Sequence, residues 1–315
     1  MSVDTTARPA TTPARRAARP PRKTRRPLSE SLTGAAMASP AVILLLVFFV
    51  VPVVLMFGLA FTNARLISPR PPRVVGFDNF VTLFGDDVFW ASLRNTAYFA
   101  VVVVPVQAGL ALVLALLVNA KVRGRNFFRT VYFVPVVTSM VVVSLLWRFI
   151  YQEDGLLNQV IETVSLGAWH GTDWLNNPHT AMPAIMLMSI WQAVGFHMVI
   201  WLAGLQTIPA ELYEAASLDG AHGWRLFRHV TWPGLRATAT FILITITIGA
   251  FSLFTQISVM TKGGPLDSTT TVVFMAVRTG YEQQQTGYAA AVSLVFFVLV
   301  LAISLLQRFL TRERS

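Results

Sequence analysis

The chain has 315 residues, of which 54% are hydrophobic and only 13% are charged, whereas a soluble domain has about 25% charged residues. This composition is typical of integral membrane proteins. The chain contains no cysteine, which excludes disulfide bonds, thiolate metal sites and cysteine nucleophiles.

The formal net charge of +10 is concentrated near the N-terminus, where residues 1–26 contain eight of the 25 basic residues. This segment is rich in Pro, Ala and Arg, so we expect residues 1–36 to be a disordered, basic cytoplasmic tail in contact with membrane lipid. No aromatic or folded nucleic-acid reader accompanies the arginines, so we expect no nucleic-acid partner.

Six segments are then long and apolar enough to cross a bilayer as helices, which takes about 20 residues each. They comprise residues 37–61, 95–118, 130–150, 181–206, 238–260 and 286–306. The expected fold class is an all-α integral membrane protein, with a six-helix domain over residues 37–310 and a short cytoplasmic tail over residues 311–315. Pro52, Pro105 and Pro135 lie inside the first three segments, where membrane helices tolerate proline and kink.

The charges of the connections predict the orientation. Residues 119–129 contain four basic residues and no acid, whereas residues 151–180 contain four acids and no Lys or Arg. Positively charged loops stay in the cytoplasm. We therefore expect both termini, and the connection between the fourth and fifth segments, to be cytoplasmic.

The six segments contain no Asp, Glu or Lys; His197 lies deep in the fourth, and Arg148 lies near the outer end of the third. Ion-coupled carriers usually place carboxylates at membrane depth. The chain also lacks the G-x-x-x-x-G-K-[ST] loop that binds nucleotides and the motifs of membrane hydrolases. We expect a passive pathway that is no enzyme by itself and that a partner drives. A self-contained secondary carrier and a membrane sensor or scaffold are the alternatives.

The connection that contains EAASLDGAHGWRLFRHVTWP, residues 214–233, predicts two short helices. The first, AELYEAASL, begins after Pro209 and ends at the Asp219-Gly220 turn. The second, HGWRLFRHV, is expected to stop at Pro233, with Trp224 and Phe227 on one face. The pattern fits both an amphipathic hairpin on lipid and a protein-docking element.

The pattern E-A-A-x-x-D-G-A, followed by an aromatic residue and a proline, resembles the EAA signature of permease subunits of bacterial ABC importers. LQTIPAELYEAASLDGA from Leu205, MTKGGP at 260–265 and TGYAAAVSLVFF from Thr286 resemble the carbohydrate-uptake branch, with its maltose-type and glycerol-phosphate-type permeases. The resemblance extends over residues 40–308 and implies the type I importer permease fold in the cell's inner membrane.

The resemblance also implies partners and roles. The partners would be a second homologous permease, a dimer of ATPase subunits that holds ATP and Mg²⁺, and an extracytoplasmic solute-binding protein; this chain would bind no cofactor or metal. The loop over residues 207–235 would couple the chain to the ATPase. The implied coupling residues are Glu214, Ala215, Ala216, Asp219, Gly220, Ala221, Phe227 and Pro233.

A sugar site needs polar groups that match hydroxyls, and aromatic faces. The candidates are Gln192, Phe196, Ser252, Thr255 and Gln256. The polar positions that line the maltose-type site fall here, in the fifth segment, on the apolar residues Ile246, Ala250 and Leu253, which disfavours maltose itself.

Polar residues in membrane helices also bond neighbouring helices, and this remains an alternative role for Ser252, Thr255 and Gln256. We expect Trp191 to pack and His197 to bond between helices. The scarcity of cations favours a neutral solute over a phosphorylated one, although Arg148 keeps glycerol phosphate open.

Overall fold

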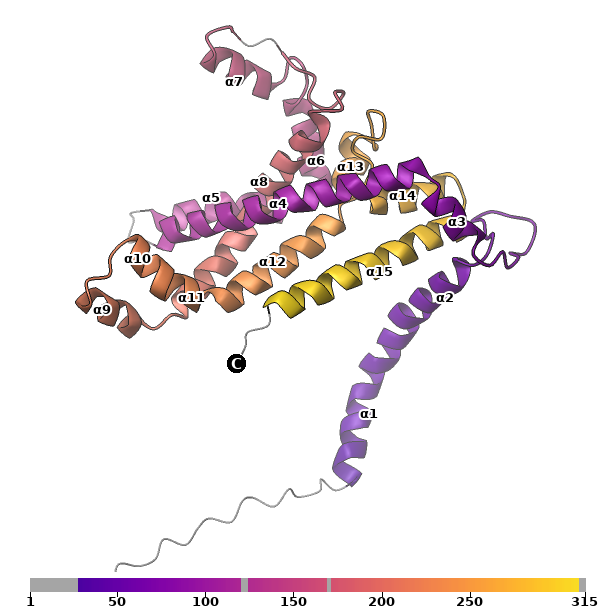
Figure 1. The fold of residues 1–315 in the computed structure, drawn as a ribbon, viewed down its shortest axis with the longest axis horizontal. Coiled ribbons are helices and arrows are strands. Elements are labelled where there is room, and N and C mark those ends of the chain that lie inside the picture. Colours follow the sequence, from indigo (N-terminus) through magenta and orange to yellow (C-terminus); the bar gives the residue numbers. More distant parts are fainter. Residues whose placement is uncertain (1–27, 120–123, 169–170, 312–315) are drawn as a thin grey trace, which may run out of the picture. The chain divides into compact units, whose positions relative to one another are not determined.

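The computed structural model describes residues 28–119, 124–168 and 171–311, and the chain divides into two compact units, residues 1–53 and 54–315. Figure 1 shows the elements of both. Most of the predicted basic tail, residues 1–27, and residues 312–315 of the predicted C-terminal tail lie outside the described residues.

The first unit contains α1 (Leu28–Leu45), the π-helical turn η1 (Leu46–Val50) and the start of α2 (Val51–Leu59). Residues 28–36, which we expected to belong to the disordered tail, lie in α1. They contain no proline, so the helix of the apolar run extends through them. In η1 the N–H of Val51 donates to the carbonyl of Leu46, and this wider turn accommodates Pro52, which follows it and has no N–H.

The described elements of the second unit are helices joined by loops, with one isolated bridge between Thr62 and Val74. Its elements after α2 are α3 (Asp78–Phe84), α4 (Asp87–Asn119), α5 (Arg125–Val137), α6 (Met140–Ile150), α7 (Leu156–Val164), α8 (Ala181–Gln206), α9 (Ala210–Leu218), α10 (Trp224–Leu226), η2 (Phe227–Thr231), α11 (Trp232–Gly234), α12 (Arg236–Phe251), α13 (Thr255–Met260), α14 (Val272–Val277), η3 (Arg278–Glu282) and α15 (Thr286–Thr311).

Among the described residues of both units, five helical segments are each long and apolar enough to cross a membrane, and the bent pair α5 and α6, counted as one span, makes a sixth. The prediction of six spans is confirmed. The second span starts earlier than predicted, at Asp87 rather than residue 95. Phe89, which is buried in a cluster with Leu83 and Val272, holds this first part of α4 in the fold. Pro105 lies within α4 and does not interrupt it.

The third and fifth predicted spans are interrupted by non-helical residues. Between α5 and α6 the chain bends by 99°, and Thr138 and Ser139 are extended there, with ψ of 139° and 132°. From Pro135 we expected only a kink in this span. The extended residues Thr138 and Ser139 end the helix instead. Between α12 and α13, the carbonyl of Leu253 accepts a hydrogen bond of 2.8 Å from the hydroxyl of Thr271. Backbone freed inside a membrane protein must find such a partner.

Helix α8 lies at the centre of the second unit. Within its most apolar window 67% of the residues are buried, compared with 33% in α4 and 22% in α15. It packs against α4, α5 and α12, and the indole of Trp201 donates to the carbonyl of Ala108 in α4 (3.1 Å). At Gly195 a Cβ atom would collide with the carbonyl of Tyr132, so glycine permits the close approach of α5 and α8.

Successive long helices of the second unit run in opposite directions, so the loops that connect them lie at two ends. The cap end contains residues 61–86, 151–168, 171–180 and 261–285, and the EAA end contains residues 207–235 (Figure 1). At the cap end, Asn95 in the third turn of α4 donates to the carbonyls of Asp267 (2.8 Å) and Thr270 (3.0 Å). These bonds tie the loop that contains the GGP sequence to the helices.

Candidate functional site

A cavity of about 200 Å³ lies between α4, α6, α8 and the broken α12–α13 span. Met140 and Leu253, next to the two helix breaks, lie in its wall. The polar residues of its lining are Gln107, Ser189, Gln192, His197, Thr245 and Gln256, and the other lining residues are apolar or glycine. The lining residues include no carboxylate, Lys or Arg. The cavity therefore offers neutral hydrogen-bonding groups within apolar walls.

Gln107 and His197 meet in the wall of this cavity. The Nε2 atom of Gln107 in α4 lies 2.9 Å from Nδ1 of His197 in α8, and the same Nδ1 lies 3.0 Å from the carbonyl oxygen of Ala193. A ring nitrogen either donates or accepts, so Nδ1 pairs with only one of these two groups in a given tautomer. The expected interhelical contact of His197 is present.

Two other polar side chains of α8 face the cavity. Gln192 is buried and its Nε2 donates to the carbonyl of Pro135 (3.3 Å), just before the break in the third span. The hydroxyl of Ser189 is buried and has no hydrogen-bond partner among the described residues. A buried hydroxyl without a partner is costly, so Ser189 is available to a solute or a water molecule in the cavity.

The structure brings together only part of the predicted substrate set. Gln192 and Gln256 line the cavity. Phe196, Ser252 and Thr255 lie outside its lining: Phe196 is 45% exposed, Ser252 is exposed with its hydroxyl bonded to the carbonyl of Ile248 (2.9 Å), and Thr255 is the first residue of α13.

Sequence reasoning missed Gln107, Ser189 and Thr245 as lining residues. Gln107 could have been predicted as a lining residue, because it is an amide within the long apolar run of the second span. Ile246, Ala250 and Leu253, the apolar residues at the maltose-type positions, do line the cavity.

At the other end of the second unit, residues 207–235 form the EAA segment. Helix α9 ends in a Schellman motif: the N–H of Ala221 bonds the carbonyl of Ala216 (2.9 Å), and the N–H of Gly220 bonds that of Ser217 (3.1 Å). Gly220 has φ of +75°, the left-handed conformation that this motif requires and that glycine adopts without strain. The predicted helix over AELYEAASL and the predicted turn at Asp219-Gly220 are confirmed.

The second part of the EAA segment differs from the prediction at Pro233. The helix does not stop there but continues through η2 and α11 into α12. In η2 the N–H of Trp232 donates to the carbonyl of Phe227, and this π turn places Pro233 in the first turn of a new helical piece, where its missing N–H costs nothing. The rings of Trp224 and Phe227 stack with centroids 5.1 Å apart, as their spacing predicted.

The EAA segment is braced internally yet presents much of its surface. The hydroxyls of Tyr213 and Thr231 are 3.2 Å apart and join α9 to η2. Of the eight predicted coupling residues, three are partly buried and five are exposed. Ala216, Ala221 and Phe227 are partly buried; Glu214, Ala215, Asp219, Gly220 and Pro233 are exposed.

Known proteins resemble this chain along most of its length. The profile of the family described as "Binding-protein-dependent transport system inner membrane component" matches residues 107–315. The lactose transport system permease protein LacF of Rhizobium radiobacter is 34% identical over 90% of this chain and 95% of its own length. The diacetylchitobiose uptake system permease protein NgcF of Streptomyces coelicolor is 36% identical over 82% of this chain and 79% of its own length.

A solved structure shares the fold. It is a bacterial alginate ABC transporter in complex with an alginate pentasaccharide-bound periplasmic protein, and one of its chains superposes with a TM-score of 0.78 at 24% sequence identity. The match covers 90% of this chain and 96% of that chain.

Proposed function

The chain belongs to the family of binding-protein-dependent transport system inner membrane components, and from this premise we propose that it is a permease subunit through which an ATP-driven importer carries a neutral di- or oligosaccharide. It is a multi-pass protein of the inner membrane. The two relatives described above are named for lactose and diacetylchitobiose, which are both neutral disaccharides.

The observation that carries the substrate class is the chemistry of the cavity. Gln107, Gln192 and Gln256 place amides in its lining, and Ser189 adds a hydroxyl without a partner among the described residues. Amides and hydroxyls both donate and accept, as sugar hydroxyls do. Phosphate recognition usually uses Arg or Lys, and the lining residues include neither. This supports a neutral sugar over glycerol phosphate.

The size of the cavity supports a shared pathway. Its volume of about 200 Å³ is below the roughly 300–1,000 Å³ of ordinary ligand sites. A disaccharide therefore needs a wider path than this chain encloses by itself. A second, homologous permease would complete the path, and the breaks at residues 138–139 and 252–254 are the points at which the lining helices can bend apart.

The energy source would lie in partner subunits. We assign the EAA segment as the element that docks on the ATPase dimer, which holds ATP and Mg²⁺; this chain binds no cofactor in the proposal. Exposed Glu214 and Gly220 would lie at the centre of the contact. The Schellman motif and the Tyr213–Thr231 contact make the segment rigid enough to pass a movement of the ATPase into α12. The EAA end is then cytoplasmic and the cap end extracytoplasmic, the orientation favoured by the basic connection at residues 119–129 and the acidic segment at residues 151–180.

The test is co-purification of the tagged chain from its native membranes in mild detergent. Wild type should retain an ATPase subunit and a second permease. The double variant Glu214→Lys with Gly220→Trp should lose the ATPase and retain the permease. The matched control is Glu162→Lys, which makes the same charge change at an exposed position of α7, at the cap end, and should behave as wild type.

The assembly, reconstituted in lipid nanodiscs, is then assayed for ATP hydrolysis with candidate binding proteins and with lactose, diacetylchitobiose or glycerol phosphate. Stimulation by a binding protein loaded with a neutral saccharide is the expected result. A wild-type chain that purifies alone and moves a solute under an ion gradient would instead establish a secondary carrier. Stimulation only by the phosphorylated solute would overturn the substrate class.

A further inference from the structure

The first loop of the cap end is a short, well-braced structure that carries three arginines. Thr62 and Val74 form an antiparallel bridge, and the backbone N–H of Arg73 donates to Oδ1 of Asn63 (2.7 Å). The residues between them, 63–73, are called the arginine loop here. Asn79 of α3 braces the base of the loop, since its side chain donates to the carbonyls of Ala60 and Thr62 (2.8 and 2.9 Å).

The arginine loop is also attached to the start of α15. The carbonyl of Ala64 accepts a hydrogen bond from the N–H of Gly287 (2.9 Å), and the N–H of Leu66 donates to the carbonyl of Gln284 (3.1 Å). A Cβ atom at Gly287 would collide with the carbonyl of Thr62. Pro69, Pro71 and Pro72 further restrict the backbone. The loop is therefore preorganised, which lowers the entropy cost of binding a partner.

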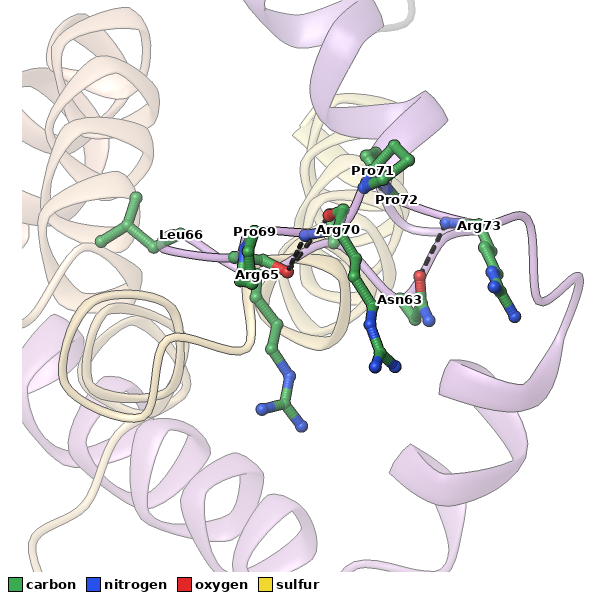
Figure 2. Close-up of a pocket in the computed structure, with 10 residues that line it drawn as sticks. Asn63, Arg65, Leu66, Pro69, Arg70, Pro71, Pro72 and Arg73 are labelled. Atoms are coloured by element: carbon green, nitrogen blue, oxygen red, sulfur yellow. Dashed lines mark hydrogen bonds between the residues drawn. The ribbon is translucent and has the colours of Figure 1, made fainter.

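The side chains of Arg65, Arg70 and Arg73 leave the same side of the loop (Figure 2). All three are exposed, and they line a hollow of about 630 Å³ together with the prolines. Among the residues that the structure describes, none of the three has a carboxylate within 4.0 Å; the ion pair found there joins Arg278 to Asp267. Asp78 and Glu282 form no ion pair with any of the three guanidinium groups in the described part of the chain.

Two segments of the cap end carry charges of opposite sign. The cap segment, residues 151–180, carries Glu153, Asp154, Glu162 and Asp173 and contains no Lys or Arg. The arginine loop, at the same end of the second unit, carries arginines and no acid. Two patches of opposite sign specify one orientation of a partner whose own charges are complementary. A lipid surface, which has a single sign of charge, does not complement both.

We propose that the arginine loop is a docking surface for a patch of Asp and Glu side chains on the extracytoplasmic solute-binding protein. The inference rests on the proposed function, because it adds the chemistry of one contact to that partner. The planar guanidinium fork pairs with carboxylates through two parallel hydrogen bonds. Three such groups on a rigid loop both attract an acidic surface from a distance and fix its register.

The test uses the permease–ATPase assembly in nanodiscs of uncharged phosphatidylcholine and the binding protein that stimulates its ATP hydrolysis. The half-saturating concentration of binding protein is measured at low and at high salt. In the double variant Arg70→Glu with Arg73→Glu, the half-saturating concentration should rise by about tenfold at low salt. It should also lose most of its dependence on salt. The maximal stimulated rate should stay near that of wild type, because neither residue lies in the cavity or in the EAA segment.

The matched control is Arg70→Lys with Arg73→Lys, which keeps the charge and should retain most of the low-salt affinity. A reversal variant that keeps the wild-type half-saturation and salt dependence would overturn the proposal. So would a defect that appears only when anionic lipid is added to the nanodiscs, since the loop would then bind lipid headgroups. If no binding protein stimulates the wild-type assembly, the proposed function fails as well; if one stimulates wild type and the reversal variant equally, only the arginine-loop proposal fails.

Discussion

Gln107 in α4 and His197 in α8 meet beside the cavity, with 2.9 Å between Nε2 of the amide and Nδ1 of the ring. Both side chains are buried, at 4% and 7% exposure. Removal of one partner leaves the other without its side-chain contact. Replacing one buried partner of a hydrogen bond destabilises a fold more than replacing both partners by apolar groups.

The first prediction follows from this pair. Gln107→Leu should lower the free energy of unfolding of the permease by about 0.6–1.7 kcal/mol, the range measured for hydrogen bonds between membrane helices. The double variant with His197→Leu should be less destabilised than the sum of the two single variants. Thermal unfolding of the purified assembly measures this coupling. Strictly additive effects would show that the pair contributes nothing as a pair.

The close approach of α5 and α8 makes the second prediction. Gly195→Ala would place its methyl group against the carbonyl of Tyr132, so the helices must separate, at a cost of about 1–3 kcal/mol for an overpacked core position. Gly109→Ala is the matched control, because nothing lies within 4 Å of its added Cβ atom. The control should be neutral or slightly stabilising. Equal melting temperatures for the two variants would contradict the packing seen at Gly195.

The Schellman motif of the EAA segment makes the third prediction. Gly220→Ala puts a Cβ atom at φ of +75°, which costs about 1–2 kcal/mol and should loosen the end of α9. Gly220→Asn should be milder, because Asn adopts this conformation more readily. The amount of ATPase subunit that co-purifies should fall in the order Gly, Asn, Ala. If Asn and Ala reduce it equally, the side chain and not the backbone conformation is responsible.

The cavity makes the fourth prediction, which tests the proposed substrate contacts. Gln192→Leu with Gln256→Leu removes two amides from the lining. Each hydrogen bond contributes about 0.5–1.5 kcal/mol, so the uptake rate with saturating, loaded binding protein should fall about tenfold.

Ser252→Ala is the control for these two amides, because Ser252 is exposed and outside the cavity lining. Its uptake rate should equal that of wild type in reconstituted vesicles. A loss of uptake in the control as large as in the double variant would remove the cavity from the transport path.

The spans and the EAA segment were predictable from local features. The length of each apolar run determines whether it crosses a bilayer, and the Asp219-Gly220 pair determines where α9 turns. The docking role that we propose for the EAA segment was already favoured over lipid binding by its two signs of charge and its few bulky apolar residues, and the resemblance to a family strengthened that choice.

The sequence by itself thus determined a membrane protein with six spans, a predicted set of spans without carboxylates, and a helix–turn–helix connection. Only the tertiary structure decided which polar groups face the cavity, so that Gln107 and Ser189 enter the lining and Phe196 and Ser252 do not. A soluble helix shows its buried face by a stripe of apolar residues. In a membrane the lipid is as apolar as the protein core, so the pattern does not distinguish the two faces. The breaks at residues 138–139 and 252–254 were hidden for a related reason, because the group that satisfies the freed carbonyl of Leu253 is the hydroxyl of Thr271, 18 residues away along the chain.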